Sequence, residues 1–284
     1  MGRHAGFTLI ELITTLLILT IISIGISGFI RSSMSIFADI TEREQLLGDS
    51  RFLIERLTRD IRNAIPNSVR VSGDSSVHCL QLVPIEYSTF YLEAPIQPSS
   101  DTTLEVVEMG DINGNAYVPS IGETFAVIYP TSESDVYDPN RNRNQAILSC
   151  SDDGTDTGCS TLDDPDNKAE LEVNGAFATD SPAERVYFST EAHSYCVRDG
   201  AVYFYQTDLS TSQPVFNTGG TLMAEFVVNQ LSNNPNSQAA NSDDPFRISD
   251  ASLLTNSVIQ IRLRFERNEE ILDYNHEVHI ANVP

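Results

Sequence analysis

The sequence predicts an α+β fold, in which one long N-terminal helix packs its second half on an antiparallel β-sheet domain. Three observations lead to this prediction. An apolar run extends from Phe7 to Ile30, residues 31–64 contain no proline and a single glycine, and short β-rich segments follow Pro66. The expected segments are a polar leader, an apolar helix, an amphipathic helix and a β-rich head. Their expected bounds are 1–6, 7–30, 31–65 and 66–284.

The apolar helix is long enough to cross a membrane, yet it carries one acidic side chain. The run from Phe7 to Ile30 corresponds to about 36 Å of helix, and a hydrocarbon core is about 30 Å thick. A carboxylate at the centre of a membrane helix costs roughly 2.5–3.5 kcal/mol. Glu11 stands near the start of this run. A plain anchor gains nothing from it, so Glu11 requires a partner.

Residues 31–65 are expected to continue the helix with one apolar stripe. The stripe recurs at helical spacing and consists of Ile36, Ile40, Leu47, Ile54, Leu57, Ile61 and Ile65. Charged residues such as Arg59 and Arg62 fill the other faces, which is typical of an amphipathic helix. Pro66 ends the helix at about Ala64, because the residue before a proline is driven out of the α region. The stripe would carry the head domain.

The head is predicted to be an antiparallel β-sheet. The expected strands are Val69–Val71, Val77–Tyr87, Leu104–Val107, Thr124–Tyr129, Arg185–Phe188, Tyr195–Arg198, Val202–Gln206, Leu222–Val228, Val258–Glu266 and Ile271–Ala281. Asp199-Gly200 separates two of them and is a strong signal for a two-residue hairpin. Apolar and polar residues alternate along 258–266, which predicts one buried and one solvated face. Tyr137–Gly175 and Gln230–Asp250 lack a regular pattern and are expected to be long irregular loops.

The leader and the start of the helix carry the clearest motif. Gly6-Phe7-Thr8-Leu9-Ile10-Glu11 resembles the class III signal of type IV pilins and type II secretion pseudopilins. A cleaved secretory signal would place small residues after the apolar run, whereas Ala5-Gly6 precedes it. The resemblance implies that a prepilin peptidase cuts after Gly6 and that the new amine of Phe7 is methylated. It also implies that Glu11 pairs with the N-terminal amine of a neighbouring subunit.

Charge and cysteine usage fit an exported protein. The formal net charge of −23 argues against a nucleic-acid surface, which needs clustered Lys and Arg. Four cysteines in an exported domain suggest two disulfides and allow three pairings. Cys150 and Cys159 flank a short loop and are expected to pair locally. Cys79 and Cys196 lie in strand-like runs and would then join distant strands.

The sequence offers little support for catalysis, and no cofactor is expected. There is no nucleophile-elbow or phosphate-loop motif. His276 and His279 are three apart, so on a strand they point to opposite faces and cannot share a metal. Asp111, Asn113 and Asn115 copy the first three ligand positions of an EF-hand loop, but Ala116 and Gly122 then depart from it. A polar turn is the better interpretation, with a calcium site as the alternative.

The whole plan resembles a low-abundance pilin. The helix end around Glu55–Val71 and the run from Tyr195 resemble a minor pilin of the mannose-sensitive haemagglutinin (MSHA) pilus, a plan shared by PilW-type minor pilins and J-type pseudopilins. The resemblance implies an inner-membrane precursor with a cytoplasmic leader and a periplasmic head. Its implied partners are the prepilin peptidase, other minor and major pilins and the assembly platform, at a place near the filament tip. A secretion pseudopilin and a tip adhesin for a surface glycan remain the alternatives.

Overall fold

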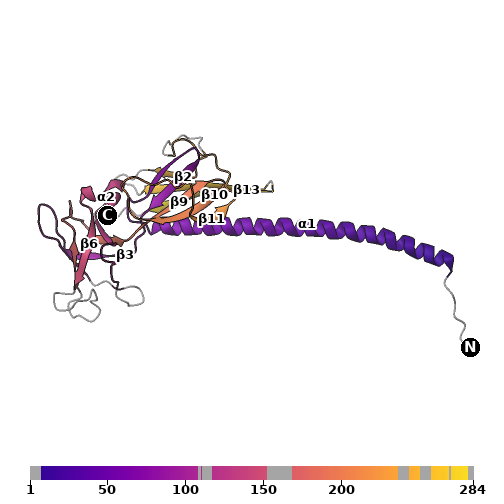
Figure 1. Ribbon diagram of the computed structural model, residues 1–284, viewed down its shortest axis with the longest axis horizontal. Helices are drawn as coiled ribbons and strands as arrows, with labels where there is room; N and C mark the ends of the chain where they lie inside the picture. Colours follow the sequence, from indigo (N-terminus) through magenta and orange to yellow (C-terminus); the bar gives the residue numbers. More distant parts are fainter. Residues whose placement is uncertain are drawn as a thin grey trace, which may run out of the picture. The chain divides into compact units, whose positions relative to one another are not determined.

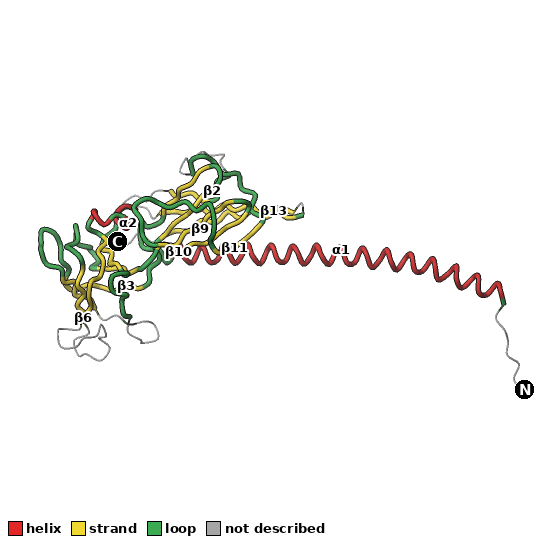
Figure 2. The backbone as a smooth tube through the Cα atoms, viewed as in Figure 1, coloured by secondary structure: helices red, strands yellow, loops and turns green. Residues whose placement is uncertain are grey.

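The computed structural model describes residues 8–107, 110, 117–151, 168–235, 243–249, 257–268 and 270–280. It confirms the predicted fold class of one long helix with antiparallel strands (Figure 1; Figure 2). The chain divides into two compact units, Met1–Asp49 and Ser50–Pro284. Helix α1 (Leu9–Arg62) contributes its N-terminal part to the first unit and its last turns to the second.

The N-terminal part of α1 is apolar and exposed. Leu12 donates its N–H to the carbonyl of Thr8 at 3.3 Å, which starts the helix at Leu9. The hydroxyls of Thr14, Thr15 and Thr20 each donate to the carbonyl three residues earlier, so these polar groups are satisfied within the helix. The helix contains an 18-residue window with a mean hydropathy of 2.4, no part of which is buried. Length and composition therefore suit a membrane span.

The last turns of α1 belong to the second unit and contribute buried side chains to its core. Leu53, Leu57 and Ile61 recur every four residues and are fully buried. The predicted stripe is therefore partly wrong: Leu53 replaces half-buried Ile54 on the buried face. Ile36 and Ile40, also in that stripe, are exposed. The helix ends at Arg62, slightly before the expected Ala64, because Ile65 leaves it and donates its N–H to the carbonyl of Val83 at 2.8 Å.

A five-stranded antiparallel sheet has the order β1-β2-β9-β10-β11. Its strands are β1 (Arg70–Asp74), β2 (Val77–Leu82), β9 (Ala192–Arg198), β10 (Ala201–Thr207) and β11 (Thr221–Glu225). The predicted hairpin joins β9 to β10, with Arg198 opposite Ala201 and positive φ at both Asp199 (50°) and Gly200 (73°). Two positive φ values are what a type I′ turn demands, and Gly adopts them without steric cost.

A three-stranded sheet has the order β12-β13-β14. Its strands are β12 (Phe246–Ser249), β13 (Ser257–Arg267) and β14 (Glu270–Ile280). The predicted alternation on β13 is confirmed, because Ile259, Ile261, Leu263 and Phe265 are buried. An antiparallel bridge between Val227 and Phe265 connects this sheet to the chain that follows β11.

Between β2 and β9 the chain builds a closed barrel with the strand order β3-β4-β7-β6-β5-β8. The strands are β3 (Tyr87–Glu93), β4 (Thr103–Val107), β5 (Phe125–Ile128), β6 (Asn144–Ser151), β7 (Lys168–Val173) and β8 (Arg185–Ser189). Two short helices, α2 (Glu133–Tyr137) and η1 (Pro139–Arg141), lie between β5 and β6. Leu104, Leu171, Phe177 and Phe188 are fully buried members of the barrel core. The barrel is thus an insertion into the five-stranded sheet.

The observed strands correct three expectations from the sequence. Tyr137–Gly175 contains β6 and β7, and Gln230–Asp250 contains β12, so neither stretch is wholly irregular. The expected strand Val77–Tyr87 is wrong in extent, because β2 ends at Leu82 and β3 begins at Tyr87. In β7 the buried Ala169, Leu171 and Val173 alternate with polar residues, but Lys, Ala, Glu and Leu favour helices in isolation. Pairing with β4 and β6 overrides that preference.

Candidate functional site

The predicted cleavage site between Gly6 and Phe7 lies outside the described residues. Glu11 lies in the first turn of α1 and is exposed. Its Oε2 accepts from the N–H of Thr8 at 3.5 Å and from the Thr8 hydroxyl at 3.4 Å. The spacing Thr8-x-x-Glu11 is that of a capping box, and here only the Glu-to-N-cap half is made. Both contacts are long, so the carboxylate keeps the capacity to accept stronger donors.

The position of Glu11 suits an ammonium partner. An acidic side chain in the first turn of a helix is favoured by the positive end of the helix dipole. Along the chain, residues 12–30 carry no other Asp, Glu, Lys or Arg. The apolar run itself therefore offers this carboxylate no cationic partner. Capping and pairing with an amine use the same oxygen atoms and are compatible, because a carboxylate accepts several hydrogen bonds.

One predicted disulfide is confirmed. Cys79 on β2 lies directly opposite Cys196 on β9, and the two are bonded across 117 residues of chain. This pair closes the base of the barrel insertion. Cys150 on β6 is also disulfide-bonded. Its expected partner Cys159 lies outside the described residues, so the Cys150–Cys159 pairing stays a prediction.

A polar cluster fixes the last turns of α1 to the five-stranded sheet. The hydroxyl of Tyr195, a fully buried residue of β9, donates to Oδ2 of Asp60. Burial raises the pKa of this hydroxyl, and the hydrogen bond to Asp60 raises it further. Tyr195 therefore stays a protonated donor at neutral pH. Arg56 adds a 4.0 Å ion pair to Asp60 and stacks on Phe204, with its guanidinium carbon 4.5 Å from the ring centre.

The metal candidates gain no support. Asp111, Asn113 and Asn115 all lie outside the described residues, so the calcium alternative is untested. Within the described ranges, no three His, Cys, Asp or Glu side chains are grouped so that they could hold a metal ion. His276 and His279 lie on β14, where His276 lines a groove beside α1 and His279 is exposed. Their separation onto two faces is as predicted.

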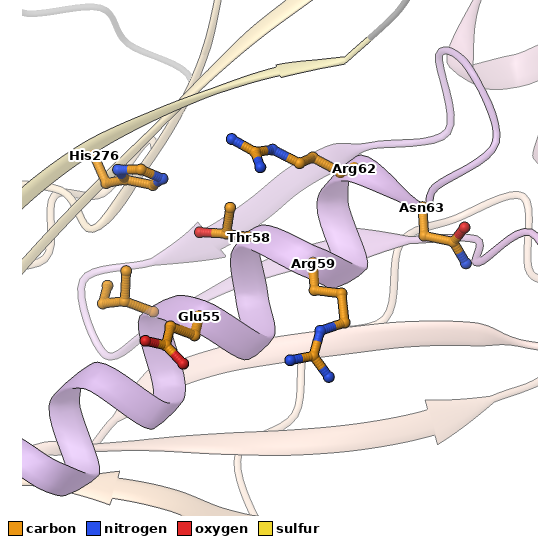
Figure 3. Close-up of a pocket in the computed structure, with 7 residues that line it drawn as sticks. Glu55, Thr58, Arg59, Arg62, Asn63 and His276 are labelled. Carbon is orange, nitrogen blue, oxygen red and sulfur yellow. The ribbon is translucent and has the colours of Figure 1, made fainter.

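That groove is a feature that sequence reasoning missed. It has a volume of about 640 Å³ and is lined by Ile54, Glu55, Thr58, Arg59, Arg62, Asn63 and His276. Figure 3 shows Arg62 extending toward His276, with Thr58 between them, whereas Arg59 extends away from that space. The helical spacing of four from Ile54 to Arg62 could have placed three of these residues on one face. Nothing in the sequence pattern brings His276 to them.

Comparison with known proteins supports the prediction that the N-terminus carries a pilin-like signal. Residues 1–27 match the family model described as the Prokaryotic N-terminal methylation motif. Neither the curated proteins nor the solved structures gave a match. The matched stretch covers the leader, Glu11 and most of the apolar part of α1. The chain therefore carries the N-terminal signal of a type IV pilin-like or pseudopilin precursor, joined to an α+β head.

Proposed function

We propose that this chain is a minor subunit of a type IV pilus, made as a precursor and built into the filament near its tip. The observation that carries the proposal is the methylation motif over residues 1–27, continuous with a helix whose large apolar side chains are exposed. Exposed apolar surface of this extent needs lipid or another protein to cover it. In the proposal the membrane covers it before assembly and neighbouring subunits cover it afterwards.

Processing creates the group that Glu11 needs. The prepilin peptidase cuts after Gly6 and frees the amine of Phe7, which is then methylated. The carboxylate of Glu11 pairs with such an amine on a neighbouring subunit. Two charges taken out of water are tolerable only when they are paired and hydrogen-bonded, so each subunit favours the position at which the pair forms. The leader is cytoplasmic, the helix crosses the inner membrane, and the head is periplasmic.

The size of the head favours a minor subunit over a major one. The second unit, Ser50–Pro284, carries an inserted barrel in addition to the sheets that pack on α1. A large head is hard to repeat in a tightly packed shaft and is easily placed at an end. The resemblance of the helix end to MSHA-type minor pilins points to that pilus. In this role the protein is structural rather than an enzyme, and it needs no cofactor.

Mass spectrometry of the mature protein tests the processing directly. The full chain, produced in its own bacterium, should lose Met1–Gly6 and begin at an N-methylated Phe7. A Gly6→Asp variant should keep the leader and stay out of sheared filaments, whereas Gly48→Ala, in the same helix with open space around it, should be processed normally. A mature wild-type chain that still begins at Met1 would refute the proposal. Recovery in pilus fractions, rather than dependence of protein secretion on the chain, separates a pilus subunit from a secretion pseudopilin.

A further inference from the structure

The last turns of α1 present one row of residues to strand β14. Ser50, Ile54, Thr58 and Arg62 follow at intervals of four, so they lie along one side of the helix. At the first of these positions the contact is closed, because the Ser50 hydroxyl and the Tyr274 hydroxyl are hydrogen-bonded at 2.9 Å. Two residues further along β14 stands His276, and there the helix and the strand leave the groove of about 640 Å³.

Several polar groups that line this groove have no partner in the described part of the chain, whereas Asn63 donates from Nδ2 to the carbonyl of Ile85 at 3.0 Å. The buried hydroxyl of Thr58 makes no hydrogen bond. Across the described ranges, neither the Arg62 guanidinium nor the His276 ring has a carboxylate oxygen within 4.0 Å or a hydrogen bond. Other arginines of the same unit differ: Arg56 and Arg264 each have an Asp carboxylate within that distance. The chain has a net charge of −23, so an arginine without an ion pair, such as Arg62, is a place where an anion is favoured.

The groove also borders an open strand edge. Among the described strands, β14 pairs with β13 alone and stands at the end of its sheet over 11 residues. An edge strand presents a row of unpaired N–H and C=O groups, which another backbone can pair with. A free anion or a lipid headgroup could pair with Arg62, but neither could form hydrogen bonds with the whole row of N–H and C=O groups along β14. The combination of an open edge with a cationic groove beside it therefore favours an extended polypeptide.

We propose that this groove receives an extended segment of a neighbouring filament subunit, which adds as a strand to β14 and places an Asp or Glu carboxylate against Arg62 and His276. The main-chain hydrogen bonds supply most of the affinity, and the carboxylate fixes the register. The Thr58 hydroxyl is placed to donate to the same carboxylate. The identity of the partner as a neighbouring subunit rests on the proposed function; the chemistry of the groove does not.

Site-specific photo-cross-linking in the native bacterium tests this inference. The full chain carries a photoreactive amino acid at Glu55, an exposed position that lines the groove, or at Ser88 in β3, an exposed control position on the barrel. Irradiation should join the Glu55 probe, and not the Ser88 probe, to another pilin-like subunit. The cross-linked peptide should contain an Asp or Glu. Arg62→Glu should reduce the adduct by about tenfold, since an unpaired buried charge weakens an interface at least that much.

The neighbouring arginine supplies the matched control. Arg59 also lines the groove but extends away from His276, so Arg59→Glu should leave the adduct nearly unchanged (Figure 3). Arg62→Lys should retain part of it, and His276→Gln should lower it without adding a like charge. Exchange of the partner's acidic residue for Lys should restore the adduct with Arg62→Glu. An adduct with phospholipid, or a protein adduct that survives both Arg62→Glu and His276→Gln, would overturn the inference.

The same samples keep this inference separate from the proposed function. Leader removal and recovery in sheared filaments are measured for each variant. If the wild-type chain is neither cleaved nor found in filaments, the proposed function fails. If cleavage and recovery are normal while the Glu55 adduct is absent or indifferent to Arg62, only the groove inference fails.

Discussion

The two ends of helix α1 are equally helical, yet they differ in what covers them. Between Leu9 and Ile40 the large apolar side chains are exposed; Leu17, for example, is 58% exposed. Between Leu53 and Ile61 the apolar side chains facing the sheets are 0% exposed. Burying a leucine is worth about 1.5–3 kcal/mol, so the second region gains free energy from its own chain and the first cannot. The difference shows that one helix serves both as the core of a domain and as an element that depends on other molecules.

The largest expected effect is in the region without an internal partner. Glu11→Ala should reduce incorporation into filaments by about tenfold or more, because the amine of a neighbour then stays buried and unpaired. Membrane insertion and leader removal should continue, since the apolar run is intact. Immunoblots of membrane and sheared-filament fractions measure both quantities.

Thr8→Ala separates the two roles of that carboxylate. It removes the hydroxyl that donates to Glu11 but leaves the charge in place. The hydrogen bond that is lost is long and exposed and is worth about 0.5–1.5 kcal/mol at most, so incorporation should fall only slightly. If Thr8→Ala and Glu11→Ala had equal effects, capping rather than pairing would explain the acidic residue.

The disulfide should affect only the second region. Replacing both Cys79 and Cys196 by Ala should lower the free energy of unfolding of the head by about 2–5 kcal/mol, because the bond closes a long loop in the unfolded chain. Thermal unfolding of the detergent-solubilised full chain, followed by near-UV circular dichroism, measures the loss. The far-UV signal of the apolar helix should persist past the head transition, and a simultaneous loss of both would contradict the comparison.

A pair of equal truncations compares the two regions directly. Leu57→Ala removes a fully buried side chain and should cost the head about 2–5 kcal/mol in unfolding free energy. Leu17→Ala removes the same atoms from an exposed position and should leave the head transition within about 0.5 kcal/mol of the wild type. Equal effects of the two variants on the head would mean that the exposed region is not energetically separate from it.

A smaller effect than that of Leu57→Ala is expected at the contact between Asp60 and Tyr195. Tyr195→Phe should cost about 1–2 kcal/mol at neutral pH, because a buried hydrogen bond to a carboxylate is lost. The wild type should also lose stability as the pH rises past 10.0, the usual pKa of tyrosine, because the unfolded chain ionises there while the folded hydroxyl, with its raised pKa, does not. Tyr195→Phe should show a weaker loss over that range. An identical alkaline slope in the variant would assign the effect to other groups.

Sequence reasoning succeeded where the signal is local. The apolar run, the Asp199-Gly200 hairpin and the alternation along β13 each depend on residues within a few positions of one another, and all three are present. The Cys79–Cys196 pairing followed because local closure of the other two cysteines left these two. The methylation motif is also local and is supported by the family match.

Sequence reasoning failed where distant segments decide the structure. The barrel closes because β3 pairs with both β4 and β8. No residue pattern within any one of these strands predicts that closure. Strand β6 begins with Asn144 and Gln145, polar residues that the fold buries by giving their side chains backbone carbonyl partners. The groove brings together Arg62 and His276, which lie near the two ends of the second unit in sequence. Such sites depend on tertiary packing, which overrides local preference.

The barrel leaves the five-stranded sheet at Leu82 and returns at Ala192, on two strands that are hydrogen-bonded neighbours and covalently joined by Cys79 and Cys196. A domain inserted between adjacent strand ends can be exchanged for another with little disturbance to its host. The chain thus passes between the sheet and the barrel only at the ends of two neighbouring strands, β2 and β9. In the proposed filament subunit, changes on the barrel surface would therefore leave the helix and the sheet that carries the barrel unchanged.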